Sequence, residues 1–168
     1  MDLLEGVRIA HVLPLVRGRL LDIGCGFNNL MRIYHGRGYG VDVHPWPGVN
    51  IVIQDASILP FRDGSFTTVT LIASLNHIPD RSGALVEVRR VLHSEGKLVM
   101  TMIGPVIGWV AHLLFRRDQR ERGHGASGER KGLSRSHLEK ILIDAGFRIT
   151  HRIRFELGLN CVYVAEKC

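Results

Sequence analysis

Short apolar runs alternate along the chain with segments in which apolar residues recur at helical spacing. The runs lie at 19–23, 39–43, 50–53, 66–72 and 97–102, and short apolar runs of this length are typical of buried strands. The fourth run is rich in β-branched residues, which favours a strand. Where strands alternate with helices, each crossover returns the chain to the same edge, so the strands run parallel. The pattern predicts an α/β fold with a doubly wound, mostly parallel sheet.

Two segments between the strands carry a clear apolar stripe of helical period. One stripe consists of Leu85, Val88, Val91 and Leu92, and the other of Leu138, Ile141, Leu142 and Ala145. We expect Gly96 to end the first helix and Gly146 to end the second, because glycine accepts the left-handed backbone that follows many helices. Ser134 or Ser136 can cap the second helix, and Ser136 with Glu139 fits a capping box.

The two ends of the chain complete the predicted architecture. Residues 5–16 indicate an opening helix that stops or bends near Pro14, since proline breaks the helical hydrogen-bond ladder. Runs at 147–155 and 160–165 flank Gly158. The turn between them is too short for a crossover helix, so this pair is expected to be antiparallel. The sequence therefore predicts seven strands with an antiparallel last strand.

Composition fits one domain spanning residues 1–168. A chain of 168 residues, 45% of them hydrophobic, can bury a core without disulfides or metals. Its three cysteines form no CxxC pair, which argues against a disulfide framework and a zinc site and favours a cytoplasmic protein. No apolar run reaches the roughly 20 residues of a membrane span.

The net charge of +6 is unevenly distributed. Residues 116–131 contain six Lys or Arg and three acidic residues, so they carry half of the excess. This glycine-rich segment is interpreted either as a solvated loop or as a patch that meets an anionic substrate or surface.

Glycines and acids gather at the ends of the predicted strands. Asp22 comes just before Gly24 and Gly26, whose missing Cβ atoms let a ligand approach the backbone. Asp42 ends the second run, and Asp55 follows the third. The carboxyl ends of parallel strands meet at one edge, where an acid can bind ribose hydroxyls. Taken singly, the glycines fit a tight turn and each acid fits a solvated loop.

Together these motifs resemble a known family. The strings that carry the likeness are LLDIGCG, GVDVHP, QDASILPFRDGSF and ASLNHIPDRSGALVEVRRVLHSEGKLVMT. In this order and spacing they resemble the class I S-adenosylmethionine-dependent methyltransferases, above all the branch that includes ubiquinone and menaquinone methyltransferases. The likeness covers residues 19–102 and resumes at 132–147. It implies a Rossmann-like fold and methyl transfer to a small-molecule or lipid-like acceptor.

The resemblance also implies S-adenosyl-L-methionine as the cofactor and assigns residues to it. The implied cofactor-binding residues are Asp22, Gly24, Cys25, Gly26, Asp42, Val43, Asp55, Ala56 and Ser74. Asp42 would hold the ribose hydroxyls, Asp55 would meet the adenine edge, and Ser74 would close the site from the other side. Asn28 stands where the family often has a third glycine. Asparagine tolerates left-handed backbone, so the turn is expected to survive.

The acceptor end of the predicted site is less defined. His77 follows the fourth run and is a candidate general base; the alternative is a histidine that shapes the loop, and His112 and His124 are weaker candidates. Residues 103–132 are interpreted as a lid or substrate insertion, with an ordinary core helix as the alternative for its apolar part around Trp109. This lid, or a neighbouring subunit in a homodimer, would exclude water. An apolar segment with basic flanks can also lie at a membrane surface.

Other functions compete with methyl transfer. A non-catalytic S-adenosylmethionine-binding module would keep the same motifs without turnover. A nicotinamide-dependent dehydrogenase would need glycine or alanine where Asn29 stands, because its fingerprint is GxGxxG. A nucleic-acid methyltransferase would carry an Asn-Pro-Pro-Tyr-type motif after the fourth strand, and this chain has none, so nucleic acid is not an expected partner.

Overall fold

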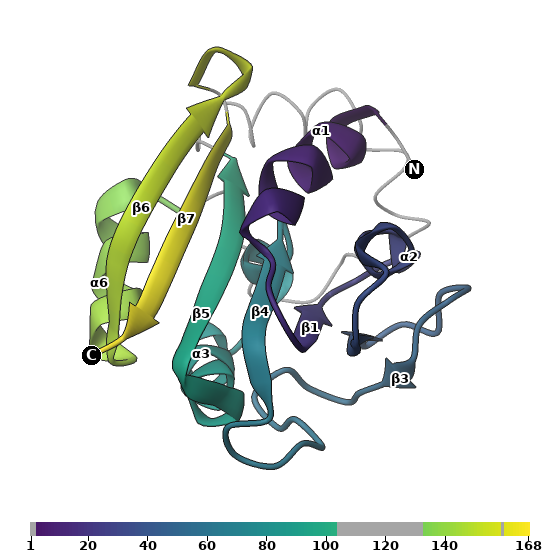
Figure 1. Ribbon diagram of the computed structural model, residues 1–168. Coiled ribbons are helices and arrows are strands. Elements are labelled where there is room, and N and C mark those ends of the chain that lie inside the picture. Colours follow the sequence, from purple (N-terminus) through teal and green to yellow (C-terminus); the bar gives the residue numbers. More distant parts are fainter. Residues whose placement is uncertain (1–2, 104–132, 159) are drawn as a thin grey trace.

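A twisted seven-stranded sheet forms the centre of the protein in a computed structural model that describes residues 3–103, 133–158 and 160–168 (Figure 1). The strand order is β3-β2-β1-β4-β5-β7-β6, and only β7 runs antiparallel to its neighbours. The predicted fold class is therefore confirmed. The strands are β1 (Leu20–Ile23), β2 (Gly38–Asp42), β3 (Ile51–Val52), β4 (Phe66–Ile72), β5 (Leu92–Ile103), β6 (Phe147–Phe155) and β7 (Asn160–Lys167).

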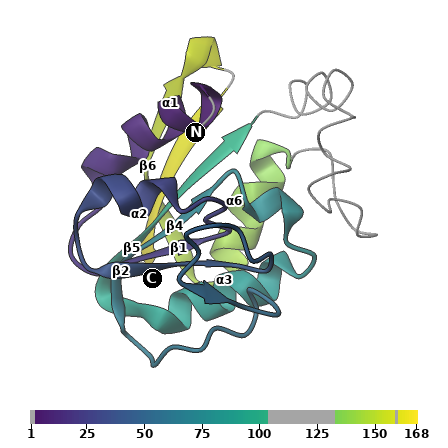
Figure 2. The same cartoon turned by 90° about the vertical axis from the view of Figure 1, so that its right-hand side faces the viewer.

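Helices cover both faces of this sheet. In Figure 2, α1 and α2 lie on one side and α3 and α6 on the other. The helices are α1 (Leu3–Val12), α2 (Asn29–Tyr34), α3 (Arg81–Val91) and α6 (Arg135–Asp144), with 3₁₀ turns η1 (Leu13–Leu15), η2 (Leu75–His77) and η3 (Glu156–Gly158). The opening helix ends just before Pro14, as expected. Within the described part of the chain, no helix combines the length and apolar composition that crossing a membrane requires.

The hydrophobic core is divided by the sheet into two clusters. On the α1 side, Ile9 and Val12 pack with Val99 and Val162. On the α3 and α6 side, the predicted helical stripes are buried together with aromatic residues of the strands. The members of that second cluster include Leu85, Val88, Val91, Leu138, Leu142, Phe66 and Phe147. The sheet is thus packed on both faces, which fixes the positions of its strand ends.

The prediction for Gly96 was wrong, because this glycine lies inside β5 and not at the end of α3. The helix ends at Val91, and β5 begins at once with Leu92 in an extended conformation. A Cβ atom built on Gly96 would lie 3.1 Å from the carbonyl oxygen of Phe66 on β4. Leu92 and His93 of β5 lie equally close, so glycine leaves room at a crowded point of the paired strands.

The N-cap of α6 is Ser134, and the predicted capping box is wrong. The Ser134 side chain accepts a hydrogen bond from the backbone N–H of His137, as an N-cap does. Ser136 already lies within the helix, and Glu139 forms an ion pair with Arg135 one turn earlier, with 2.6 Å between Arg135 Nε and Glu139 Oε1. The helix ends before Gly146, which has a φ of 79°, as the sequence predicts.

The strand order reverses between β1 and β4, which makes this the switch point of the sheet. From β1 the chain first builds β2 and β3 on one side, then crosses to β4 and β5 on the other. In open parallel sheets, ligands bind beyond the carboxyl ends of the strands at such a point. The predicted lid at 103–132, with Trp109, His112 and His124, falls outside the described residues except for Ile103 at the end of β5.

Candidate functional site

The glycine turn after β1 opens the candidate site. Gly24 and Gly26 have φ angles of 70° and 51°, which side chains with a Cβ atom adopt with strain. A Cβ atom on Gly24 would lie 2.5 Å from the Cβ of Ser74. A Cβ atom on Gly26 would meet nothing within 4 Å. Gly24 therefore permits the segment after β4 to approach β1, whereas Gly26 leaves bare backbone facing open space.

Asp42, the last residue of β2, holds this turn in place. Its Oδ2 accepts the backbone N–H of Gly26 at 2.9 Å, and its Oδ1 accepts that of His44 at 3.0 Å. The residue is only 8% exposed. Each carboxylate oxygen has two lone pairs, so Asp42 can still accept hydrogen bonds from a ligand beside the turn.

Asp22 is the second buried acid at the switch point. Its Oδ1 accepts a hydrogen bond from the Thr70 hydroxyl at 2.6 Å, and the residue is 3% exposed. Burial raises the pKa of Asp22 to about 7; the Thr70 hydrogen bond opposes this, while the negative charges of Asp42 and Glu5 add to it. A cationic ligand would reverse the effect of these neighbours and favour the ionised form.

Two contributors to the site, Thr70 and Glu5, have no distinguishing feature in the sequence. Thr70 reads as an ordinary β-branched strand residue, yet it is the donor to Asp22. Glu5 lies on α1 and accepts a hydrogen bond from Asn29 Nδ2 at 2.9 Å. This contact ties α1 to the first residue of α2 and brings the charge of Glu5 near Asp22. Contacts between elements so far apart in sequence follow no local period, so only the fold reveals them.

The residues after β3 lie at the same edge of the sheet. The backbone N–H of Ile53 donates to the Asp42 carbonyl at 2.9 Å, which keeps this segment beside β2. Asp55 Oδ1 accepts the N–H of Ser57 at 2.9 Å, an Asx turn that fixes the carboxylate. Ala56 is buried, whereas the Val43 side chain is 62% exposed. The edge thus offers an apolar contact next to hydrogen-bonding groups.

The segment after β4 closes the site from the other side. The Ser74 hydroxyl donates to the Ile23 carbonyl at 2.8 Å. Ala73 has a φ of 52°, a left-handed conformation that is strained for alanine, and its N–H donates to Thr101 Oγ1 at 3.0 Å. His77 is exposed in η2. The structure therefore brings Ser74 against the glycine turn, and it places His77 on the exposed surface that follows.

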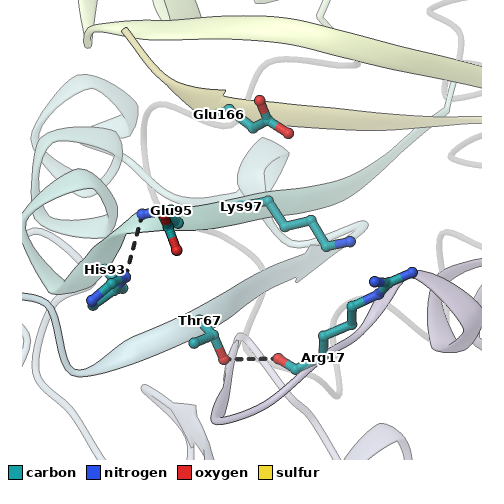
Figure 3. A pocket seen from close by; sticks show the side chains of 6 residues that line it. All are labelled: Arg17, Thr67, His93, Glu95, Lys97 and Glu166. Carbon is teal, nitrogen blue, oxygen red and sulfur yellow. Dashed lines mark hydrogen bonds between the residues drawn. The ribbon is translucent and has the colours of Figure 1, made fainter.

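A hollow of about 450 Å³ lies at the opposite end of the sheet (Figure 3). It is lined by side chains from the amino ends of β4 and β5, from the segment before β1 and from the end of β7. These residues are Arg17, Thr67, His93, Glu95, Lys97 and Glu166. None of the residues singled out in the sequence lines this hollow, so the candidate chemistry is at the other end.

Known methyltransferases are similar to this chain in sequence. A family model described as a methyltransferase domain matches residues 21–100, from β1 into β5. Phthiotriol/phenolphthiotriol dimycocerosates methyltransferase 1 of Mycobacterium ulcerans is 31% identical over 158 residues, covering 82% of this chain and 58% of that protein. A demethylmenaquinone methyltransferase of Lactiplantibacillus plantarum is 30% identical over 128 residues, covering 67% of this chain and 54% of that protein.

Solved structures share the architecture at lower identity. A SAM-dependent methyltransferase from Aquifex aeolicus superposes with a TM-score of 0.69 at 16% identity, covering 94% of this chain and 88% of that chain. This likeness shows the fold. The chain spans a little over half the length of the two curated relatives named above.

Proposed function

We propose that this chain, which belongs to the class I S-adenosylmethionine-dependent methyltransferase family, binds S-adenosylmethionine at the carboxyl edge of β1, β2 and β3 and transfers its methyl group to a small-molecule or lipid-like acceptor. When bound, this cofactor supplies a methyl group already activated on a sulfonium. The chain's own residues would bind the cofactor, orient it toward the acceptor and exclude water from the site.

One observation carries the proposal: two buried acids converge on backbone that has no side chain in the way. Asp22 and Asp42 are close enough for the charge of Asp42 to raise the pKa of Asp22. Gly26 leaves open space directly beside the Asp42 hydrogen bond. Buried carboxylates are costly without a cationic or hydrogen-bonding partner. A ligand with a sulfonium, an amino group and a ribose diol would supply both kinds of partner.

The residues around the acids suit the remaining parts of such a ligand. Val43 presents an exposed apolar side chain and Ala56 a small buried one, which fits a flat base held at the end of β2. The carboxylate of Asp55 is held by its Asx turn and can accept from an exocyclic amine. Ser74 is held against Ile23 and borders Gly24. Cys25, in the turn between Gly24 and Gly26, completes the proposed set of nine cofactor-binding residues.

The acceptor class is proposed from the relatives. The two named above act, by their names, on phthiotriol dimycocerosates and on demethylmenaquinone, a lipid and a quinone. We infer a hydrophobic acceptor for this chain and keep His77 as the proposed base, because its exposed imidazole follows β4. His77→Gln would then lower turnover while leaving cofactor affinity unchanged.

Calorimetric titration of the full chain tests the cofactor. We expect micromolar binding of S-adenosylmethionine and S-adenosylhomocysteine and no binding of NADH. Incubation with S-adenosylmethionine and a short-chain demethylmenaquinone in detergent, followed by mass spectrometry, should show the acceptor gaining one methyl group. No binding of either sulfur compound would overturn the proposal. Binding without methylation of quinone or lipid acceptors would favour the non-catalytic module.

A further inference from the structure

The connection between β2 and β3 is unusual for a parallel pair. β2 ends at Asp42 and β3 begins at Ile51, so residues 43–50 make the whole crossover and contain no helix. Parallel neighbours generally need a dozen or more residues, most often with a helix that packs on the sheet. In Figure 1 this stretch extends as a loop beside β3. Something other than a packed helix must hold it.

Asn28 supplies hydrogen bonds that fasten this connection. Its Nδ2 donates to the Gly48 carbonyl at 2.7 Å and to Asn50 Oδ1 at 3.0 Å. The same Asn50 oxygen accepts the backbone N–H of Gly40 on β2 at 2.7 Å. Asn28 is 4% exposed, so water competes little for these bonds. The amide therefore joins the glycine turn, the end of the loop and β2.

The surroundings of Asn28 are built for its side chain. A Cβ atom on Gly40 would lie 2.0 Å from Asn28 Oδ1, so β2 leaves room by having glycine there. The φ of Asn28 is 58°, a conformation that glycine would adopt more easily. Asn28 Oδ1 is buried without a hydrogen-bond partner, which is unfavourable. The positive φ and the unpaired Oδ1 of Asn28 both destabilise the fold, whereas the two hydrogen bonds from its Nδ2 stabilise the connection.

The fastened loop carries one wall of the candidate site. The N–H of His44 is one of the two donors to Asp42, at 3.0 Å. The centroid of the Trp46 ring lies 4.2 Å from that of the His44 ring and 5.2 Å from that of the Phe27 ring in the glycine turn. We propose that Asn28 is a positioning residue, which clamps residues 43–50 against the glycine turn and so sets the wall beside Asp42. This inference rests on the proposed function for its ligand.

The test compares Asn28→Gly with His35→Gly at the other end of α2. His35 also has a positive φ, 55°, so both changes relieve left-handed backbone, but only the first removes the clamp. In a Trp109→Phe background, Trp46 is the one remaining tryptophan of the chain. We expect Asn28→Gly to weaken S-adenosylhomocysteine binding about tenfold, because residues 43–50 would no longer be held in place before the ligand binds and would have to be ordered on binding. We also expect Trp46 emission to shift to the red, and His35→Gly to change neither.

A conservative pair at Asn50 gives an independent reading. Asn50→Asp keeps an oxygen that can accept from Asn28 Nδ2 and from the Gly40 N–H, so it should retain binding and emission. Asn50→Ala removes the acceptor and should behave like Asn28→Gly. This pair decides the matter if Asn28→Gly fails to fold cooperatively. A general loss of stability would not separate the aspartate from the alanine variant.

The outcomes distinguish this inference from the proposed function. Unchanged affinity and unchanged Trp46 emission in Asn28→Gly would overturn the clamp. Equal losses in Asn50→Asp and Asn50→Ala would overturn it as well. If the unmodified chain does not bind S-adenosylhomocysteine, the proposed function fails. The emission of Trp46 in ligand-free protein still tests the clamp in that case, because the hydrogen bonds of Asn28 form without ligand.

Discussion

The two ends of this sheet treat charged side chains in opposite ways. At the carboxyl end, Asp22 and Asp42 are buried, and each accepts hydrogen bonds from groups fixed by the fold. At the amino end, Arg17 and Lys97 converge on a hollow from separate elements, with Glu166 on the neighbouring strand (Figure 3). Arg17 is exposed and Lys97 half-buried, so water solvates much of their charge.

A hollow in the surface does not by itself identify the functional end of this sheet. Charges lining an open hollow cost little to keep, because solvent screens them. Burying a carboxylate beside another one is costly, and such an arrangement is retained where it performs a task. We therefore infer that the buried acids at the carboxyl end, and not the hollow, mark the functional end of the sheet.

The largest expected effect is at Asp42. Asp42→Ala removes the proposed ribose acceptor and leaves the N–H groups of Gly26 and His44 without their partner. We expect S-adenosylhomocysteine affinity to fall about a hundredfold, since hydrogen bonds to charged groups are the stronger ones. Titration calorimetry measures the loss, and a cooperative melt shows that the variant still folds. Glu166→Ala at the amino end is the matched control. Equal losses in the two variants would remove the contrast between the ends.

A smaller effect is expected from the protonation of Asp22. Its folded pKa of about 7 lies above the ordinary value of 3.8, so the folded state binds more protons than the unfolded state between these values. Stability from this group is therefore greatest at low pH and falls as pH rises through the window. Asp22→Asn keeps an acceptor for Thr70 and removes the titration. We expect its gain in the free energy of unfolding over the original chain to be largest at pH 8 and close to zero at pH 4.

The same substitution should weaken ligand binding, which separates stability from function. A cationic cofactor favours ionised Asp22, so affinity should decline as pH falls below about 7 in the original chain and stay flat in Asp22→Asn. Denaturant melts and calorimetry between pH 5 and pH 8 measure both trends. A pH-independent difference in stability between the two chains would contradict the burial of a titrating acid.

Most of the fold could be predicted from local pattern, because buried strands and helical stripes repeat at fixed periods. The run at 66–72 coincides with β4, and Gly146 ends α6. Gly96 was misplaced because a glycine after a helical stripe looks the same whether it ends the helix or lies in a tightly paired strand. The atoms nearest to Gly96 belong to Leu92 and His93 at the start of β5 and to Phe66 of β4, and only the strand pairing brings Phe66 there.

The candidate site could be predicted only where it follows strand ends. Asp22, Asp42 and Asp55 come to one edge because parallel strands require it. The contributions of Glu5 and Asn29 depend on how α1 packs across α2, and no spacing rule indicates that. Residues placed by the ends of parallel strands are therefore easier to predict than residues that meet through the packing of helices.

The smallest expected effect is at Lys97 in the hollow. Partial burial lowers the pKa of Lys97 first, the nearby Arg17 lowers it further, and Glu166 acts in the opposite direction. A lysine with a lowered folded pKa binds its proton less tightly than in the unfolded chain, so its charge slightly opposes folding at neutral pH. Lys97→Gln removes that charge. We expect the free energy of unfolding to change by less than about 0.5 kcal/mol, because solvent screens the site.

The affinity of the Lys97→Gln variant for S-adenosylhomocysteine tests whether the amino end of the sheet contributes to ligand binding. Lys97→Gln should leave the S-adenosylhomocysteine dissociation constant within about twofold of the original value, well below a tenfold change of 1.4 kcal/mol. Calorimetry at low and at physiological ionic strength measures it, because any long-range effect of the charge should shrink with added salt. A large loss of affinity that added salt does not reduce would mean that a change in the hollow alters ligand binding at the carboxyl edge through the sheet. Burial of charged side chains would then no longer distinguish a functional end from a solvated end.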